Sequence, residues 1–351
     1  MVRLPTVRSP QAGTSAYLAG IMMDAGTDKT LTEEEADPVP LAWVPYADRG
    51  EAERRLGSLP AGLELDFYRA GGDDFPGTID EVAFYVLPYM RGPAVLSRAA
   101  EMPKLQVVQT LTAGYEEFLP LVPPGATLCN AAGLHDTSTA ELAIALALAS
   151  GRHLDEFARN QAEGAWKFVF GRALADQRAL IAGYGRIGQA IERRLDGFEV
   201  ASVTRVARSA RTGPPLVHPA EDLHRLLPEA DVVFLIAPHT PQTEGLIGAR
   251  ELALLPDDAL LVNVARGKLV DTDALVAELA TGRIRAALDV TEPEPLPADH
   301  PLWRQPGVLI SPHVGGASSA FFPRADRLMA VQLARFTAGQ PLENVVKPAE
   351  S

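Results

Sequence analysis

Three short blocks in the second half of the chain carry residue types that could do chemistry together. The first contains Gly183, Gly185 and Gly188, a spacing that can hold the phosphates of a dinucleotide. The second supplies Arg266, which can bind an anion. The third places His313 downstream of a pair of glutamates, and a histidine beside a carboxylate can donate a proton near neutral pH. A dinucleotide, an anion-binding arginine and a proton donor together predict the reduction of a keto acid.

The glycine block lies in the context that a dinucleotide-binding turn requires. A strand-like run, 180–182, enters it and a helix-like run, 187–195, leaves it, whereas a turn without a ligand is the alternative. Gly183 permits the tight turn, Gly185 lets the backbone approach the pyrophosphate, and Gly188 lets the helix pack on the strand. The pyrophosphate would then lie at a helix N-terminus, where free N–H groups favour negative charge. The residues between the glycines are expected to share the contact: Tyr184, Arg186 and Ile187.

The next predicted strand indicates which dinucleotide is bound. NAD-binding folds of this kind carry an Asp or Glu about 20 residues after the glycines, where it binds the ribose 2′-hydroxyl. This chain has Val-Thr-Arg-Val-Ala-Arg at 203–208, with no acid and two arginines. A guanidinium binds a 2′-phosphate with paired hydrogen bonds, whereas a carboxylate repels it. We therefore expect NADP(H), with Arg205 as the main ligand of the 2′-phosphate, Thr204 assisting and Arg208 as a weaker candidate. NAD(H) is the alternative if these arginines are only solvated surface residues.

Apolar runs in the second half predict the strands of one parallel sheet, alternating with helices. They lie at 179–182, 200–204, 232–236, 260–264, 284–288 and 308–310. Ligands bind outside the carboxyl ends of such strands. Arg266, Glu294 and His313 each follow a predicted strand, so the fold can bring them together although they are far apart in sequence.

The first half predicts a second alternating set of strands and helices. The strands are expected at 41–44, 63–68, 82–87, 105–110 and 127–129, and the helices between them at 49–59 and 94–100. A longer helix is expected at 137–150, capped by Asp136 or Thr137, and a last helix at 322–338 is expected to return to the first sheet. We therefore predict a two-lobed α/β protein. Residues 38–136 and 317–351 are assigned to a substrate domain, 137–316 to a dinucleotide-binding domain, and 1–37 to a disordered N-terminal extension.

Composition and charge argue against several classes of protein. The 351 residues are 47% hydrophobic and 22% charged, which is typical of a soluble globular protein. The formal net charge of -13 argues against a nucleic-acid partner, and no apolar run approaches the roughly 20 residues of a membrane span. The single Cys129 excludes an internal disulfide and a cysteine-based metal cluster, and no metal is expected. The N-terminus lacks the pattern of a signal peptide, so we expect a cytoplasmic protein.

Taken together, these blocks resemble the D-isomer specific 2-hydroxyacid dehydrogenase family. The resemblance runs from about residue 105 to 342 and is densest after 178. It rests on the glycine motif and on further segments at 111–115, 140–142, 238–247, 263–267, 287–290, 294–296 and 311–313. It implies a two-lobed α/β fold, with a flavodoxin-like substrate domain and a Rossmann dinucleotide-binding domain.

The resemblance implies a role for each residue of the catalytic set. Arg266 would bind the substrate carboxylate and polarise its ketone, and His313 would donate a proton to the carbonyl oxygen. A carboxylate would orient the imidazole and raise its pKa. The family pattern puts this carboxylate five positions after Asp289, which selects Glu294 over Glu292. Asp289 itself would contact the nicotinamide carboxamide.

The same resemblance extends to further substrate and cofactor contacts. The backbone of Ala113 and Gly114 would hold the substrate carboxylate. Ala113 in place of lysine counts against phosphite as the substrate, and Glu294 in place of glutamine counts against formate. Tyr89, which follows a first-lobe strand together with Met90, is expected to touch the substrate side chain or else to be a core or rim residue. The remaining cofactor contacts are expected at Ala237, Pro238, Val264 and Ala265, besides Asp289 and His313.

The expected activity is NAD(P)-dependent reduction of small 2-keto acids, such as glyoxylate or hydroxypyruvate, to D-2-hydroxy acids, with His313 as general acid and base. Two alternatives stay open. One is a nucleotide-sensing binding protein without turnover, like the transcriptional corepressors related to this family. The other is a dehydrogenase for a bulkier acid of secondary metabolism. The family's homodimer, built through the cofactor lobes and the region 164–166, is also expected.

Overall fold

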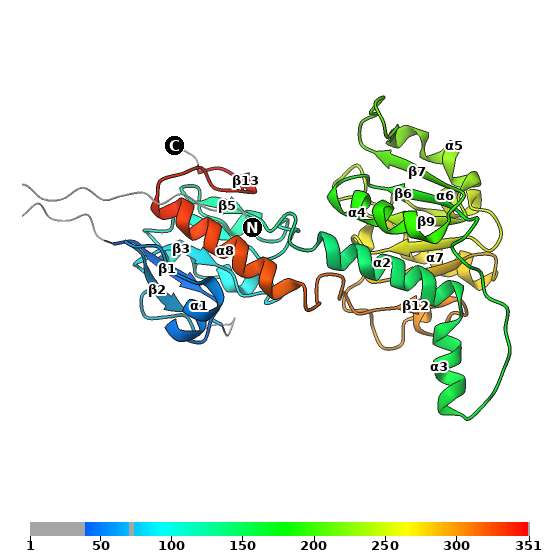
Figure 1. Ribbon diagram of the computed structural model, residues 1–351, viewed down its shortest axis with the longest axis horizontal. Coiled ribbons are helices and arrows are strands. Elements are labelled where there is room, and N and C mark those ends of the chain that lie inside the picture. The colour runs from blue at the N-terminus through cyan, green and yellow to red at the C-terminus, as the bar shows by residue number, and fades with distance from the viewer. Residues whose placement is uncertain (1–38, 70–73, 350–351) are drawn as a thin grey trace, which may run out of the picture. The chain divides into compact units, whose positions relative to one another are not determined.

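Two mainly parallel sheets, each with helices around it, organise the residues that the computed structural model describes, 39–69 and 74–349 (Figure 1). The mixed α/β class is therefore confirmed. The disorder predicted for residues 1–37 lies outside the described residues.

The first sheet has six strands in the order β13-β5-β4-β3-β1-β2. Their bounds are β1 Leu41–Val44, β2 Glu64–Phe67, β3 Val82–Val86, β4 Val107–Gln109, β5 Thr127–Cys129 and β13 Val345–Lys347. Five of them are parallel and lie within the predicted runs. The sequence did not predict β13, which pairs antiparallel with β5 at the edge of the sheet. Three partly exposed residues are too few to show a strand pattern.

Alternate residues of each strand send their side chains to opposite faces of this sheet. Trp43 packs on one face, where it meets the one-turn 3-10 helices Pro93–Leu96 and Ala99–Glu101. These two turns replace the single helix expected at 94–100. Ala42 packs on the other face, beneath the helices α1 (Arg49–Leu56) and α8 (Phe321–Thr337).

The last helix, α8, packs on the first sheet although it follows the second sheet in the sequence (Figure 1). Phe321, Ala325, Met329 and Leu333 are spaced four residues apart and are all buried in the same core cluster as β1 and β3. This spacing forms one stripe along a helix. Burial of the stripe fixes the start of α8 near the carboxyl ends of the first-sheet strands.

The second sheet has seven strands in the order β12-β11-β10-β9-β6-β7-β8. Their bounds are β6 Arg178–Ala182, β7 Ser202–Ala207, β8 His218–Pro219, β9 Val232–Leu235, β10 Leu260–Asn263, β11 Arg285–Leu288 and β12 Val308–Ile310. The paired strands are parallel throughout. The chain runs outward in both directions from the adjacent strands β6 and β9, so the topological switch point lies between them. The two-residue strand β8 was not predicted.

The strand β7 corrects one prediction that bears on the cofactor. It was expected at 200–204 but spans Ser202–Ala207, and Arg205 pairs in register with Ile181 of β6. The apolar run ends before Arg205, which is why the sequence placed the strand end too early. A charged residue is tolerated inside β7 because its guanidinium is paired with Glu192.

Helices cover both faces of the second sheet. One face packs against α2 (Asp136–Gly151) and α4 (Arg186–Leu195), and the other against α5 (Leu223–Leu226), α6 (Ala249–Leu254) and α7 (Thr272–Ala280). A further helix, α3 (Leu154–Ala162), follows α2. None of the helices in the described part of the chain is long and apolar enough to cross a membrane.

The predicted cap of α2 was wrong. The residue at the N-cap is His135, whose side chain makes no capping hydrogen bond. The Asp136 carboxylate instead accepts a hydrogen bond of 2.8 Å from Nε of Arg186, in the first turn of α4. A favourable ion pair with the neighbouring helix replaces the local cap.

Candidate active site

The glycine motif has the backbone shape that a dinucleotide needs. Gly183 has φ +114°, and a Cβ placed on it would lie 2.4 Å from the backbone nitrogen of Ala237. A Cβ on Gly188 would lie 2.5 Å from the carbonyl oxygen of Gly183, so glycine lets α4 pack on β6. At Gly185, by contrast, a Cβ would have no described heavy atom within 4 Å. The backbone therefore closes tightly beneath the turn and leaves open space beside the start of α4, where a pyrophosphate fits.

Two side chains of the motif have protein partners. Tyr184 is buried, and its hydroxyl donates a hydrogen bond to Glu192 of α4. Arg186 is bonded to Asp136, as described for α2. Ile187 lies half-buried in the first turn of α4. The backbone N–H and carbonyl of Tyr184 are also hydrogen-bonded, to Val206 and Arg211. Arg186 would have to exchange its carboxylate partner for a phosphate to bind the cofactor.

The strands beside the switch point deliver the other predicted cofactor contacts. Ala237 and Pro238 follow β9, and Val264 and Ala265 follow β10, where both are buried. The close approach of Gly183 to Ala237 brings the first pair directly against the glycine turn. All four residues therefore lie at the carboxyl edge of the sheet, where doubly wound folds bind nucleotides.

The two arginines near the end of β7, Arg205 and Arg208, differ in how many protein groups they bond. Nε of Arg205 donates to both carboxylate oxygens of Glu192, at 2.9 and 3.0 Å, and Nη1 donates to the carbonyl of Val203 at 3.0 Å. The side chains of Arg205 and Glu192 are only 21% and 16% exposed. The hydrogen bond raises the pKa of Arg205 and lowers the pKa of Glu192, so both stay charged. Arg208 is exposed, directly after the strand, and makes no ion pair with any residue in the described ranges.

The Asn263–Gly267 block forms a tight turn that presents Arg266. The Asn263 side chain donates to the carbonyl of Arg266 at 3.0 Å and accepts from the N–H of Ala265 at 3.1 Å. A Cβ on Gly267 would lie 1.9 Å from the carbonyl oxygen of Thr291, so only glycine fits there. Asn263 stabilises the turn by hydrogen bonds inside it, and Gly267 lets the turn pack closely against the backbone of Thr291. These two roles explain the spacing of the block.

His313 and Glu294, two of the predicted catalytic residues, form a hydrogen-bonded pair. Nδ1 of His313 bonds to Oε1 of Glu294, while Glu292 is exposed. The pair is partly open to solvent, with side chains 36% and 38% exposed. The hydrogen bond to Glu294 raises the pKa of His313, although burial and the charge of Arg266 act in the opposite direction. Nε2 is left to face a ligand, and the raised pKa favours the protonated imidazole, which can act as an acid.

Asp289 holds the loop that carries His313. Its side chain is buried, and its carboxylate accepts hydrogen bonds from the Ser311 hydroxyl at 2.6 Å, from the N–H of Val314 at 2.9 Å and from the N–H of Gly315 at 2.8 Å. The backbone N–H of His313 also donates to the Asp289 carbonyl at 2.8 Å. This network fixes His313 at φ +51°. The role predicted for Asp289, contact with the nicotinamide, stays a prediction.

The loop at 112–114 offers backbone donors beside Arg266. The carbonyls of Ala113 and Gly114 accept hydrogen bonds of 2.7 Å from Asn130 and Thr112, whereas their N–H groups donate to no residue in the described part of the chain. A Cβ on Gly114 would lie 1.8 Å from Nη2 of Arg266. The Arg266 guanidinium therefore lies against Gly114, and together they can bind a carboxylate.

Tyr89 lies beside this loop, in an aromatic cluster. Its ring centroid lies 4.2 Å from that of Phe321 and 5.7 Å from that of His135. A Cβ on Gly316 would lie 2.9 Å from the Tyr89 hydroxyl and 2.5 Å from Nδ1 of His135. Burial raises the pKa of Tyr89, which keeps the phenol neutral. Met90 has a 56% exposed side chain and is turned outward.

Sequence reasoning missed several residues that support these groups. Asn263 stood in a recognised block, but its hydrogen bonds to the Arg266 turn were not foreseen. Asn130 and Glu192 gave no signal, because each acts on a residue that is remote in sequence. Arg211 was not predicted to support the glycine motif, yet its guanidinium donates to the Tyr184 carbonyl at 2.6 Å and lies 5.3 Å from the centre of the Tyr184 ring.

The described chain is similar to known dehydrogenases. The family profile described as D-isomer specific 2-hydroxyacid dehydrogenase, NAD binding domain, matches residues 144–315. A glyoxylate reductase of Korarchaeum cryptofilum is 35% identical over 326 residues, which cover 86% of this chain and 95% of that protein.

Solved structures show the same similarity. A D-isomer specific 2-hydroxyacid dehydrogenase of Xanthobacter autotrophicus, in complex with NADPH and MES, matches with a TM-score of 0.72 and 30% identity, covering 89% of this chain and 98% of that one. An NADPH-dependent glyoxylate/hydroxypyruvate reductase of Sinorhizobium meliloti, in complex with NADP and malonate, matches with a TM-score of 0.72 and 26% identity, covering 88% of this chain and 97% of that one.

Proposed function

The chain belongs to the D-isomer specific 2-hydroxyacid dehydrogenase family, and we propose that it reduces glyoxylate- or hydroxypyruvate-like 2-keto acids to D-2-hydroxy acids with Arg266, Glu294 and His313 as its catalytic set. It is an NAD(P)-dependent oxidoreductase of small 2-keto acids. The observation that carries the residue assignment is the His313–Glu294 hydrogen bond at the carboxyl edge of the second sheet. The alternative of a nucleotide sensor without turnover is not favoured, because the relatives are named as reductases.

The substrate carboxylate is held by Arg266 and by the N–H groups of Ala113 and Gly114. These donors lie close together, because the Arg266 guanidinium lies against Gly114. An anion is bound well by a guanidinium together with two backbone N–H groups that have no partner among the described residues. The same guanidinium can polarise the neighbouring ketone, which makes the keto carbon a better acceptor. Tyr89 then faces the substituent on that carbon.

His313 supplies the proton that the ketone oxygen takes up during reduction. A bound nicotinamide cofactor supplies the hydride, and the open space beside Gly185 and the start of α4 fits its pyrophosphate. Glu294 favours the protonated imidazole and orients it through Nδ1, so that Nε2 presents the transferable proton. In the reverse direction, neutral His313 accepts a proton from the hydroxy acid.

We further propose that the cofactor is NADP(H) and that Arg208, rather than Arg205, is the main ligand of its 2′-phosphate. The absence of an acid at 203–208 supports the preference for NADP(H), because no carboxylate would repel the 2′-phosphate there. Arg205 lies inside β7, and its guanidinium is already bonded to Glu192. Arg208 follows the strand end and is exposed, so it can move to a phosphate without breaking an internal pair. Thr204 lies one position further back inside β7 than Arg205. NAD(H) stays the alternative cofactor.

The assignment of residues to two lobes and a homodimer are also proposals. Each hydrophobic cluster draws either on residues up to 134 and beyond 320 or on residues 140–310, which supports the boundaries 38–136, 137–316 and 317–351. The segment between α3 and β6 exposes Trp166, Phe168 and Phe170 by 101%, 79% and 87%. A cluster of aromatic rings this exposed is typical of a protein–protein interface. The cytoplasmic location stays a prediction.

The proposed function is tested by following NADPH or NADH absorbance with glyoxylate and hydroxypyruvate. His313→Asn is expected to lower kcat by about 10²–10⁴-fold, the usual contribution of a general acid, and to leave cofactor binding unchanged. His224→Asn is the matched control, because His224 is also hydrogen-bonded to a glutamate, Glu251, but lies on α5. Turnover by His313→Asn at a rate near that of the unaltered protein would refute the assignment of the acid. No turnover of either acid by the unaltered protein would refute the substrate class.

A further inference from the structure

A hollow of about 190 Å³ opens at the carboxyl edge of the first sheet, beside the start of α8. Residues that follow β1, β2, β3 and β4 line it together with α1 and α8. Its walls include the rings of Tyr46, Tyr89 and Phe322. Three arginines, Arg55, Arg69 and Arg91, also line it, and no Asp or Glu is among its described lining residues. Two carboxylates, those of Glu51 and Asp326, pair with Arg55 and Arg69, so the three arginines leave an excess of positive charge beside the hollow.

One of the three arginines, Arg55, already has carboxylate and aromatic partners within the protein. Arg55 lies between two aromatic rings, 4.9 Å from the centre of Tyr46 and 5.0 Å from that of Phe322. Its guanidinium also pairs with Asp326 at 2.8 Å and with Glu51 at 3.3 Å. Arg55 therefore builds the wall of the hollow, and its charge is already balanced.

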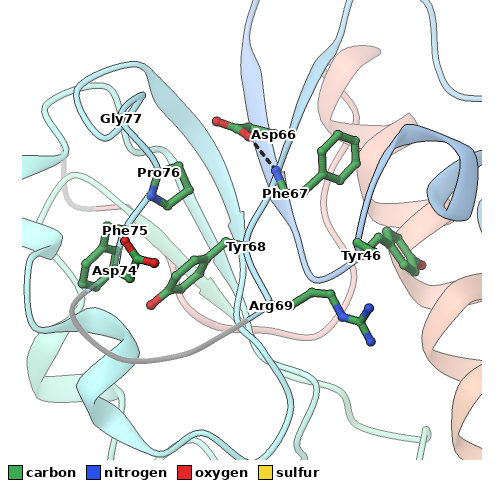
Figure 2. Close-up of a pocket in the computed structure, with 10 residues that line it drawn as sticks. Tyr46, Asp66, Phe67, Tyr68, Arg69, Asp74, Phe75, Pro76 and Gly77 are labelled. Atoms are coloured by element: carbon green, nitrogen blue, oxygen red, sulfur yellow. Dashed lines mark hydrogen bonds between the residues drawn. The ribbon is translucent and has the colours of Figure 1, made fainter.

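The other two arginines are available to a ligand. The Arg69 side chain is 60% exposed, and the carboxylate paired with it is that of Glu51, at 3.7 Å. Figure 2 shows that the Arg69 side chain extends toward Tyr46, away from the side on which Tyr68 lies. Arg91 is exposed and forms no hydrogen bond or ion pair with any residue in the ranges that the structure describes. Two guanidinium groups thus reach the hollow without a strong partner.

The hollow adjoins the place where the substrate substituent must lie. Tyr89 belongs to both, because its ring lines the hollow and its hydroxyl lies 2.9 Å from the Cβ position of Gly316. Gly316 follows His313 by three residues. Leu111 also lines the hollow, immediately before the loop at 112–114. A substrate whose carboxylate is held by that loop would therefore direct its other end toward the arginines.

We infer that this hollow binds a second anionic group, a carboxylate or a phosphate, at the far end of the 2-keto acid. The inference rests on the proposed reduction of 2-keto acids and, among them, favours dianionic acids over the monoanions glyoxylate and hydroxypyruvate. An aromatic tail fits less well, because Arg55 already covers the rings of Tyr46 and Phe322, and Phe321 covers that of Tyr89. The groups that remain without strong partners are the cations Arg69 and Arg91, and guanidinium groups bind carboxylate and phosphate with charge-assisted hydrogen bonds.

The test compares kcat/KM for acids that share the keto acid end and differ in the tail. The probes are pyruvate, phenylpyruvate, 2-oxoglutarate with a carboxylate tail, and 3-phosphohydroxypyruvate with a phosphate tail. We expect one of the dianionic acids to be the best substrate, and the better of the two identifies the anion. Arg69→Gln and Arg91→Gln should each lower kcat/KM for that acid about tenfold, the loss of one charge-assisted contact, and leave pyruvate unchanged. Arg54→Gln, an exposed position on α1 outside the hollow, is the matched control and should change neither.

The possible failures are distinguishable. Turnover of pyruvate with no gain from an anionic tail, or with a gain that both variants leave intact, would overturn this inference and leave the proposed function standing. A preference for phenylpyruvate would overturn it in favour of an aromatic occupant. If no 2-keto acid were turned over, the proposed function would be refuted and this inference with it.

Discussion

Replacement of single arginines near β7 should separate cofactor recognition from folding. Arg208→Ala removes an exposed guanidinium that follows the strand and has no ion-pair partner in the described chain. Arg205→Ala removes one that is bonded to Glu192 and to the Val203 carbonyl. Only the first change should weaken binding of the 2′-phosphate, because only Arg208 can reach a ligand without giving up a protein partner.

The magnitudes follow from exposure and from the number of bonds lost. For Arg208→Ala we expect Kd for NADPH to rise about tenfold, at the low end for a charge-assisted contact because solvent and salt screen it. Kd for NADH should change less than about twofold, since NADH has no 2′-phosphate. For Arg205→Ala the half-buried Glu192 loses its charged partner and keeps the hydrogen bond from the Tyr184 hydroxyl, at a cost of about 2 kcal/mol in the free energy of unfolding. In a chain of 351 residues such a loss lowers Tm by roughly 3 °C.

Fluorescence titration of NADPH and NADH, with thermal unfolding in parallel, measures both effects. The ratio of the two Kd values is the decisive quantity, because a general loss of structure changes both in the same direction. A selective loss of NADPH affinity in Arg205→Ala, with Arg208→Ala unaffected, would refute the reasoning from the structure and restore the assignment made from the sequence. Tighter binding of NADH by the unaltered protein would refute the NADP preference itself.

Two further predictions concern the catalytic pair and the exposed aromatic segment. Reduction requires protonated His313, so kcat/KM should fall as the pH rises through the pKa of His313. Because the Glu294 hydrogen bond raises that pKa, Glu294→Gln should move the falling limb of the pH–rate profile to lower pH. A falling limb that does not move would contradict the pairing. The double variant Trp166→Ser, Phe170→Ser should shift the sedimentation coefficient from that of a dimer to that of a monomer. The control Leu216→Ser, at another exposed apolar residue, should leave the coefficient unchanged. If the unaltered protein sedimented as a monomer, the dimer would be ruled out.

The strands that build the site could be predicted from sequence because they are buried on both faces. β6, β9, β10 and β11 are short apolar runs, which parallel central strands require, and their carboxyl ends then locate the functional loops. β8 and β13 were missed, because two or three residues at a sheet edge need no apolar pattern. The end of β7 was placed too early because a charge inside a strand hides its continuation.

The partners of the site residues were harder to predict than the residues themselves. Arg266 and His313 follow strand ends, which is a local rule, and the family resemblance selected Glu294. The bonds of Arg205 to Glu192 and of Arg186 to Asp136 depend on how helices pack on the second sheet. No spacing in the sequence encodes that packing, so the motif residues were all assigned to the cofactor without regard to competing carboxylates.

The two carboxylates near His313 divide its control between position and protonation. Asp289 is buried, binds three groups of the loop at 311–315 and thereby fixes the backbone of His313. Glu294 is more than one-third exposed and, among the residues that the structure describes, bonds the imidazole alone, so it acts on the pKa and the ring orientation. A buried carboxylate with all its bonds satisfied is a rigid support, whereas an exposed one can respond to solvent and to a bound ligand. Both carboxylates follow β11: Asp289 at the strand end holds the position of the proton donor, and Glu294 in the loop beyond it tunes the pKa.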